Sequence, residues 1–301
     1  TIEDSFIETE SFLKIAAISE SVKELKKYFK KFHNYYPNLS FLSEHVDFVQ
    51  EIIDEIKKVI SAYGEIVDNA SPELRKIRRS IAGLQGKIGQ SFSSALGKAK
   101  AAGYLDDIKE SVVDNHRVLA VLAMHRKKVT GSLVGSSKSG NIVYIAPQAT
   151  LAYQRELQNL EYEEKQEVIR ILKNLSYQIR PYTPLLESYL VYLAHLDVIG
   201  SKAKYAYSIN GLLPKIGETK RVYFKNAYHP ILLVKNKEAN LEVVPQSIEL
   251  NEQQQIIVIS GPNAGGKSIT LKTIGLLQVM LQSGILIPVD ERSETTIFDT
   301  V

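Results

Sequence analysis

The sequence contains no cysteine, no tryptophan and no long hydrophobic run. The lack of cysteine excludes a disulfide framework, a thiol nucleophile and a zinc–thiolate site. No apolar run approaches the roughly 20 residues that a membrane-spanning helix needs. The acidic N-terminus also lacks the basic and apolar regions of a signal peptide. We therefore expect a cytoplasmic protein without a membrane segment.

The remaining composition is ordinary for a globular protein, with 44% hydrophobic and 24% charged residues among 301. This length allows about two domains on the usual prior of roughly 150 residues each. The sequence begins at Thr1 and ends in IFDTV, and we expect it to be part of a longer protein.

The net charge of +3 is unevenly distributed along the sequence. Residues 1–70 carry 8 basic and 13 acidic side chains, whereas residues 71–148 carry 13 basic and 5 acidic ones. Clustered Lys and Arg attract phosphate backbones, although charge alone fits a solvated basic face equally well. The candidate nucleic-acid contacts are Arg75, Lys76, Arg78, Arg79, Arg126, Lys127, Lys128 and Lys138.

Apolar residues at three-to-four spacing make the first 210 residues mostly helical. Ser71-Pro72 is a strong helix start, because a capping hydroxyl precedes Pro at the first helical position. Four glycines weaken the helix that follows, which would span about 45 Å over thirty residues. The spacing predicts helices over 12–29, 48–63, 72–103, 151–180 and 186–208.

Short segments rich in β-branched residues interrupt the helical pattern at 117–124, 131–137 and 141–147. They predict two or three strands of a small sheet. The simplest arrangement is an antiparallel helical arm with this sheet at its tip, carrying the basic surplus. The charged segment 161–167 is interpreted as a solvated helix face.

After Gly211 the pattern changes to strands at 221–233, 254–263 and 285–289, with a helix that ends at Gly284. A strand, a glycine loop, a helix and a strand predict a βαβ unit with a parallel sheet. The predicted fold class is therefore mixed: a mainly α-helical core with a small β element, followed by the start of an α/β domain.

One motif carries chemistry. The residues from 261 to 268 match G-x-x-x-x-G-K-[ST], and a chance match in 300 residues arises roughly once in a hundred chains. Glycines allow the backbone amides to face phosphate oxygens, and the following helix adds the positive end of its dipole. Lys267 would neutralise the β- and γ-phosphates of ATP, and the Ser268 hydroxyl would bind Mg²⁺. The candidate loop consists of Gly261, Pro262, Asn263, Ala264, Gly265, Gly266, Lys267, Ser268 and Ile269.

The segment VISGPNAGGKSITLKTIGLLQVMLQSGILIPVDE strongly resembles the phosphate loop and following helix of the MutS family, type-two branch. Agreement continues, in the family's order, in SAYGEIVDNASPELRKIRRSI, GSSKSGNIVYIAPQA, IGSKAKYAYSIN and KNAYHPILL. The resemblance therefore covers most of the sequence from about residue 60. It departs from the family where the usual Arg-His-Pro is Tyr228-His229-Pro230.

The resemblance implies four parts: a helical core and outgoing lever (1–108), a clamp (109–150), returning lever helices (151–212) and the first part of an ATPase domain (213–301). It also implies a homodimer that grips branched or duplex DNA under the control of ATP and Mg²⁺. The Walker B acidic pair, the family's catalytic histidine and the nuclease-like module of this branch are expected outside these residues, so no catalytic residue is predicted here.

Four alternatives remain open. A ribosome-associated ATPase that splits stalled ribosomes would use the same basic groups on RNA. A chromosome-organising ATPase with coiled arms normally has its phosphate loop before the arm, whereas here the loop follows about 260 residues. A metabolic P-loop kinase would not need a long arm ahead of its loop. The last alternative is an interaction module without enzymatic activity.

Overall fold

The computed structural model describes residues 5–113, 116–262 and 266–301. Its contacts divide the chain into two units, one ending at Leu190 and one beginning at Val191, with the helix α6 crossing the division. The helices of the first unit are α1 (Thr9–Lys31), α2 (Pro37–Glu44), α3 (Glu51–Val59), α4 (Pro72–Ala101), α5 (Gln148–Ile179) and α6 (Thr183–Ser208). Its 3₁₀ turns are η1 (Asp68–Ala70), η2 (Ala123–Lys128) and η3 (Arg180–Tyr182). Its strands are β1 (Leu105–Val113), β2 (His116–Leu122), β3 (Gly131–Ser136) and β4 (Ile142–Pro147).

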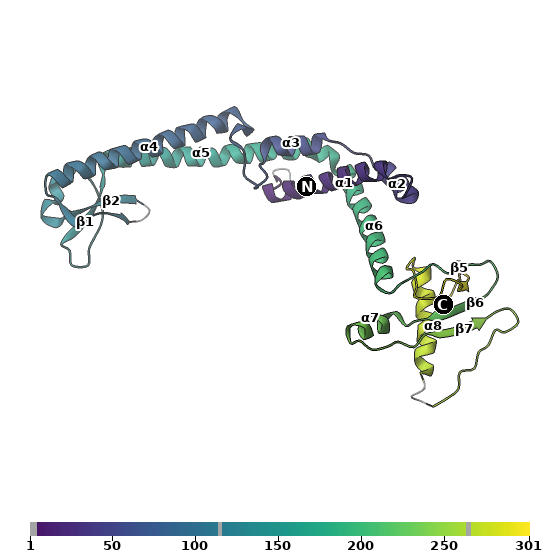
Figure 1. Ribbon diagram of the computed structural model, residues 1–301. Coiled ribbons are helices and arrows are strands. Elements are labelled where there is room, and N and C mark those ends of the chain that lie inside the picture. The colour runs from purple at the N-terminus through teal and green to yellow at the C-terminus, as the bar shows by residue number, and fades with distance from the viewer. Residues whose placement is uncertain (1–4, 114–115, 263–265) are drawn as a thin grey trace. The chain divides into compact units, whose positions relative to one another are not determined.

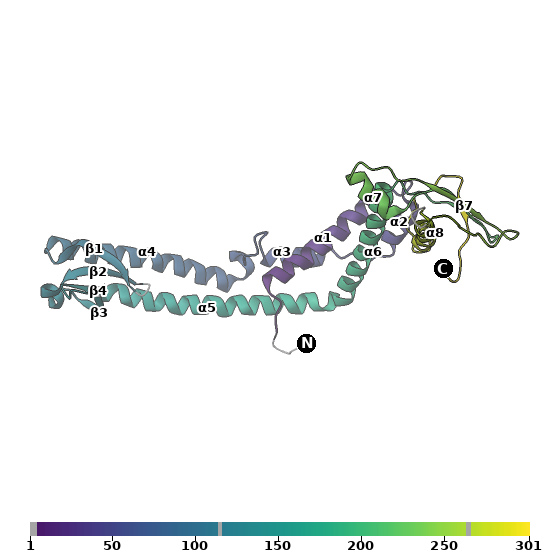
Figure 2. The ribbon, with the colours of Figure 1, turned by 90° about the horizontal axis from the view of Figure 1, so that it is seen from below.

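The two long helices α4 and α5 lie side by side over most of their length (Figures 1 and 2). The predicted start of α4 is confirmed, because the Ser71 hydroxyl accepts a hydrogen bond from the Leu74 amide at 2.9 Å and Pro72 is the first helical residue. The helix continues through its glycines to Ala101, where Gly103 follows with a φ of +68°. The predicted helix 151–180 is also present, as α5.

Two buried or half-buried contacts join the first turns of α4 to α5. The Ser71 hydroxyl donates to Glu167 at 2.6 Å, and Arg170 holds the same carboxylate with two bonds of 2.7 Å. Arg78 donates to Glu164 at 2.7 Å. The interpretation of 161–167 as a purely solvated face is therefore wrong for Glu164 and Glu167, because both carboxylates bind groups on or next to α4.

A small antiparallel sheet lies at the end of α4, with the strand order β1-β2-β4-β3. It contains the three predicted strands and a fourth, β1, whose charged sequence hid it. β1 is an edge strand, and charged residues are common on such edges. The apolar faces of β2 and β4 pack against α4 through Phe92, Ala99, Leu119, Val121, Val143 and Ile145.

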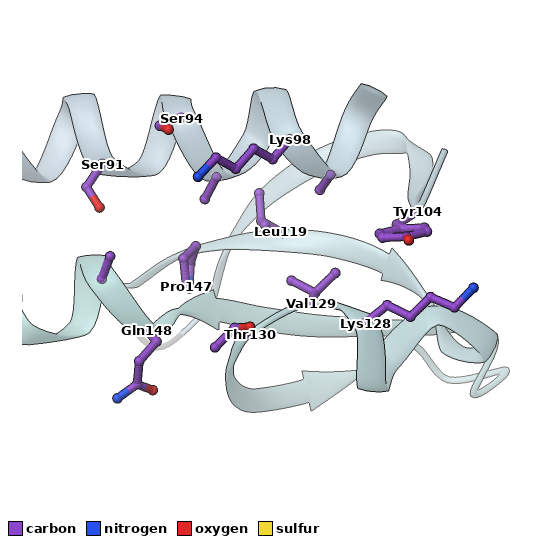
Figure 3. A pocket seen from close by; sticks show the side chains of 13 residues that line it. Ser91, Ser94, Lys98, Tyr104, Leu119, Lys128, Val129, Thr130, Pro147 and Gln148 are labelled. Atoms are coloured by element: carbon purple, nitrogen blue, oxygen red, sulfur yellow. The ribbon is translucent and has the colours of Figure 1, made fainter. Parts of the chain in front are cut away.

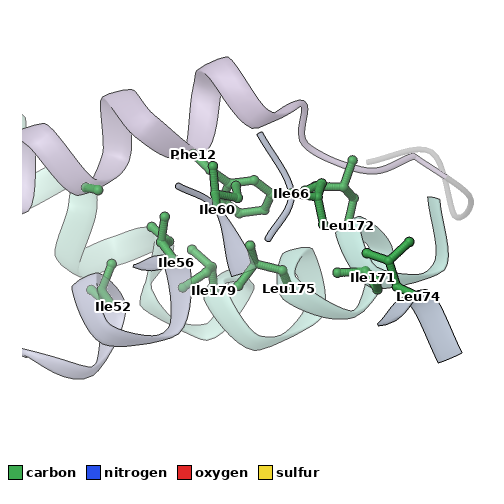
Figure 4. Close-up of a cluster of buried hydrophobic side chains, with 11 residues drawn as sticks. Phe12, Ile52, Ile56, Ile60, Ile66, Leu74, Ile171, Leu172, Leu175 and Ile179 are labelled. Carbon is green, nitrogen blue, oxygen red and sulfur yellow. The ribbon is translucent and has the colours of Figure 1, made fainter. Parts of the chain in front are cut away.

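The opposite end of the first unit has its own hydrophobic core, which joins α1, α3 and the end of α5 (Figure 4). α2 was not predicted. Its eight residues dock on α1, where the Ser40 hydroxyl donates to the Phe29 carbonyl at 3.1 Å. The buried core residues are Phe12, Ala16, Ile52, Ile56, Ile60, Ile66, Leu74, Ile171, Leu172, Leu175 and Ile179.

The second unit is built around a small mixed sheet and one long helix. Its elements are β5 (Lys215–Ile216), β6 (Val222–Ala227), α7 (Pro230–Glu238), β7 (Gln246–Leu250), α8 (Lys267–Gln282) and β8 (Glu294–Thr295). β6 pairs antiparallel with both β7 and β8, and only the short pair β5–β8 is parallel. α8 packs on this sheet through Leu277, Met280 and Leu281.

Several strand predictions in the second unit are wrong. The strand expected over 221–233 ends at Ala227, and Pro230 begins α7 instead. Residues 254–260 form no strand, and 285–289 make only a single bridge, between Ile287 and Leu212. The predicted parallel βαβ unit is therefore absent from the described residues, because no strand lies beside 254–260 to complete a ladder. The helix that ends at Gly284 is confirmed, and Gly284 has a φ of +72°.

In coarse terms the fold class is confirmed as mixed, since long helices and two small sheets make up the chain. Within the residues that the structure describes, no helix is both long and apolar enough to cross a membrane.

Candidate functional site

The predicted phosphate loop connects an exposed segment to the first residue of α8. Gly261 and Gly266 have φ values of +144° and +82°, which only glycine adopts without strain. Gly266 is the N-cap of α8, so the helix begins at Lys267 as the motif requires. Asn263, Ala264 and Gly265, which the motif also includes, lie outside the described residues.

Lys267 is the loop residue with the clearest local contact. Its ammonium group donates to the carbonyl of Gly261, so the side chain reaches back across the loop from the start of α8. The structure therefore brings together Gly261 and Lys267, the first and the seventh residues of the motif. A cation held over the loop is placed to meet an anion that enters it.

The start of α8 has the backbone geometry of a helix N-terminus. The Thr270 amide donates to the Gly266 carbonyl at 3.0 Å, and the amides of Lys267, Ser268 and Ile269 precede this bond in the helix. Amides in the first turn of a helix have no acceptor within the helix, and the dipole adds positive potential there. The Ser268 side chain is exposed, so its hydroxyl is open to a ligand.

The segment before the loop differs from the buried strand that the sequence predicts. Ile256 and Val258 are 83% and 85% exposed. Ile257 and Ile259 are also exposed. Residues 256–259 are all apolar, but no neighbouring strand among the described residues covers either face.

His229 lies near α8, and the sequence did not predict which charged group would be close to it. Burial lowers its pKa below the ordinary histidine value, and the charge of Lys272 on α8 lowers it further. A neutral imidazole at physiological pH follows. The sequence signal was the His-Pro pair ahead of α7, but the contribution of Lys272 depends on the folded arrangement.

The predicted nucleic-acid contacts fall into two groups at opposite ends of α4. Arg126, Lys127 and Lys128 lie in η2, and Lys138 lies in the turn between β3 and β4, so these four belong to the sheet end. All four are exposed. Lys98 and Lys100, in the last turn of α4, add two exposed cations that the sequence reasoning did not select. We call these six residues the tip cations.

The other group, Arg75, Lys76, Arg78 and Arg79, lies in the first turns of α4. Arg78 is held by protein acceptors: it donates to Glu164, to Asp68 and, at 2.8 Å, to the Ile66 carbonyl. Its guanidinium therefore has a structural role in joining α4 to α5. Arg75, Lys76 and Arg79 are exposed.

Among the residues that the structure describes, no group of three or more His, Asp or Glu side chains is arranged to hold a metal ion. A Mg²⁺ ion at the loop would therefore depend on the Ser268 hydroxyl and on the phosphate oxygens of a nucleotide.

Comparison with known proteins gives similar sequences over almost the whole chain. It is 37% identical over 302 aligned positions to the Endonuclease MutS2 of Finegoldia magna, a match that covers 98% of this chain and 37% of the relative. It is 33% identical over 300 positions to the Putative endonuclease MutS2 of Bacillus subtilis, which covers 99% of the chain and 38% of that protein. An Endonuclease MutS2 of Alkaliphilus oremlandii is 32% identical over 299 positions. No protein-family model matches. The chain thus spans a little over a third of the length of these relatives.

Proposed function

We propose that this chain is part of an ATP-gated clamp on DNA. The premise is its resemblance to the type-two branch of the MutS family, which these matches confirm. The observation that carries the proposal is the similarity to three proteins named as MutS2 endonucleases, which covers 98–99% of the chain and includes the glycine loop. The clamp would hold branched or duplex DNA without reading its sequence, in a process related to repair or to the suppression of recombination.

ATP with Mg²⁺ is the proposed cofactor, and the described part of the loop fits a phosphate group. Positive φ angles at Gly261 and Gly266 turn the backbone where the motif needs it. Lys267 would neutralise the β- and γ-phosphates, and Ser268 would contribute an oxygen to the metal. The bound nucleotide supplies a phosphoanhydride bond whose hydrolysis changes the charge at the loop. Asn263, Ala264 and Gly265 belong to this proposal on the motif alone.

The proposed mechanical parts follow the division at 1–108, 109–150, 151–212 and 213–301. α4 and α5 would be the lever, because two long helices joined at one end by Glu164 and Glu167 carry a sheet at the other. The sheet and η2 would be the clamp, with the tip cations against phosphate. A homodimer in the cytoplasm would place two such levers around one duplex.

Nucleotide binding by this chain tests the proposal at the loop. We expect ATP to bind in the presence of Mg²⁺ and Lys267→Ala to weaken that binding by at least about tenfold, since one charged contact is worth roughly 1.5–3 kcal/mol. Lys272→Ala, on the same helix but outside the motif, is the matched control. We expect turnover at the background rate, because the catalytic groups of the family are expected outside these residues.

DNA binding tests the other half of the proposal, and ribosomes provide the competing target. The same titration with branched DNA, paired duplex and purified ribosomes ranks the partners. A preference for ribosomes would replace DNA by ribosomal RNA as the target. Equal affinity of the wild-type chain and Lys267→Ala for ATP would contradict the nucleotide loop.

A further inference from the structure

A hollow with a volume of about 570 Å³ lies between the last turns of α4 and the small sheet (Figure 3). It is separate from the glycine loop, which belongs to the other unit. Its lining comes from α4, from β2, from the end of η2 and from the junction of β4 with α5. These residues are Ser91, Ser94, Ala95, Lys98, Ala99, Tyr104, Leu119, Lys128, Val129, Thr130, Pro147, Gln148 and Ala149.

The hollow exists because α4 presents small side chains to the sheet there. Ser94 and Ala95 lie three and four positions after Ser91, so all three are on one face of the helix, where larger residues would fill the gap. Adjacent positions on α4 pack tightly, since Phe92 is fully buried against the sheet. The packed core beside the hollow fixes its walls, so the space is preformed.

The charged side chains that line the hollow are positive. Among the residues that the structure describes, no carboxylate lines it, whereas Lys98 of α4 and Lys128 of η2 do. The Lys128 ammonium lies 5.4 Å from the centre of the Tyr104 ring. Within the described residues, neither Lys98 nor Lys128 has a carboxylate partner. The carboxylate of Glu110, in strand β1 of the same sheet, is paired with Arg117 at 2.8 Å. These features favour an anionic ligand.

The uncharged part of the lining adds hydrogen-bonding groups and an apolar side. The hydroxyls of Ser91, Ser94 and Thr130 and the amide of Gln148 border the space (Figure 3). Leu119, Val129 and Pro147 provide the apolar side. A ligand that suits both sides has a planar apolar part and a phosphate.

We propose that this hollow binds a phosphate-bearing ligand of the size of one nucleotide. Its volume lies within the roughly 300–1,000 Å³ of small-molecule sites, and lysine ammonium groups form charge-assisted hydrogen bonds with phosphate oxygens. The same chemistry has two sources: a free nucleoside monophosphate, or an unpaired nucleotide in a DNA strand. Only the second source rests on the proposed DNA clamp.

The experiment uses the 301-residue chain with Lys267→Ala in every variant, so that the glycine loop does not contribute to nucleotide binding. Calorimetry measures a nucleoside 5′-monophosphate, and anisotropy compares a paired duplex with the same duplex carrying one unpaired nucleotide. Ser94→Trp fills the hollow, and Ser93→Trp, one residue away and exposed outside the lining, is its control. Because the sequence has no tryptophan, the emission of each variant reports whether the new indole is buried.

A second pair of variants changes charge instead of volume. Lys98→Glu and Lys100→Glu alter the same helix by the same charge, but only Lys98 lines the hollow. We expect Lys98→Glu to weaken monophosphate binding by at least about tenfold, the effect of one lost charged contact, and Lys100→Glu to leave it unchanged. This pair decides the question if Ser94→Trp does not fold.

The outcomes separate the two sources and the two proposals. Monophosphate binding that Ser94→Trp abolishes and Ser93→Trp preserves supports the hollow as a nucleotide site. A preference for the unpaired nucleotide that disappears in the same variant identifies the strand as a source. Equal binding within both pairs of variants overturns the proposal. If no duplex binds at low salt, the DNA clamp fails while the monophosphate measurement still tests the hollow.

Discussion

Removing charge at one end of α4 is expected to change the salt dependence of DNA binding, whereas the same removal at the other end is not. The tip cations number six (Lys98, Lys100, Arg126, Lys127, Lys128 and Lys138), and all are exposed. The variant to make is the triple substitution Arg126→Gln, Lys127→Gln and Lys138→Gln. The control is Arg75→Gln, Lys76→Gln and Arg79→Gln, which changes the net charge equally.

The magnitude follows from counterion release. Each phosphate contact contributes about 0.9 to the slope of log affinity against log salt. Six contacts give an affinity loss on the order of a thousandfold between 50 and 200 mM salt, and the three that remain in the tip variant give roughly fortyfold. The control should keep the larger loss, because its three side chains lie in the first turns of α4 and are not among the tip cations.

Fluorescence anisotropy with a labelled duplex, titrated at several salt concentrations, measures both slopes. Circular dichroism shows whether each variant keeps its helices. Equal slopes in the two variants would refute the assignment of DNA contact to the tip. A reduced slope in the control alone would move the contact to the first turns of α4.

Four further predictions concern stability. Gly86→Ala in α4 should stabilise the chain by about 0.5–1 kcal/mol in urea unfolding, because an added Cβ meets nothing within 4 Å. Gly131→Ala should instead destabilise it, since that Cβ would lie 2.2 Å from the Ala146 carbonyl oxygen. Glu167→Ala should cost about 2–3 kcal/mol at neutral pH by leaving the Ser71 hydroxyl and Arg170 without their shared acceptor; an unchanged urea midpoint would contradict the contact. His229 has a lowered pKa, so the unfolded chain takes up its proton first. Its contribution to stability is full above about pH 6.5 and is lost as the pH falls through the folded-state pKa; thermal unfolding of His229→Gln should lack this loss.

The helices were predictable because their signals are local. Apolar spacing and the Ser71-Pro72 start placed α4 correctly at its first residue, and Gly284 placed the end of α8. α2 has only eight residues and depends on bonds to α1 such as Ser40 to Phe29. Contacts of that kind join residues distant in sequence, and periodicity contains no information about them.

The strand predictions failed because strand formation depends on contacts that are not local in sequence. The apolar run 256–259 has the composition of a buried strand, but a strand also needs a neighbour. β1 shows the converse, because its partner β2 makes a strand from the charged segment Leu105–Val113. Strand identity is thus a property of a pair of segments, which a single stretch of sequence does not specify.

The candidate sites were likewise predictable only where their residues are contiguous in sequence. The glycine loop was found because its residues are contiguous, and the structure places Gly266 and Lys267 at the start of a helix as the motif requires. The hollow beside α4 was not found, because Lys98, Tyr104 and Lys128 come from separate elements. The bond of Arg78 to Glu164 spans 86 positions in the sequence, so charge counting could not separate Arg78 from its exposed neighbours.

The two long helices differ in one respect that matters for stiffness. α4 contains Gly83, Gly86, Gly89 and Gly97, whereas α5 contains no glycine from Gln148 to Ile179. Glycine in a helix interior is less favourable than alanine by about 1 kcal/mol. Bending strain along the pair will therefore concentrate in the middle of α4, and its amides will exchange with deuterium sooner than those of α5. Of the two helices, α5 resists bending more strongly than α4 does.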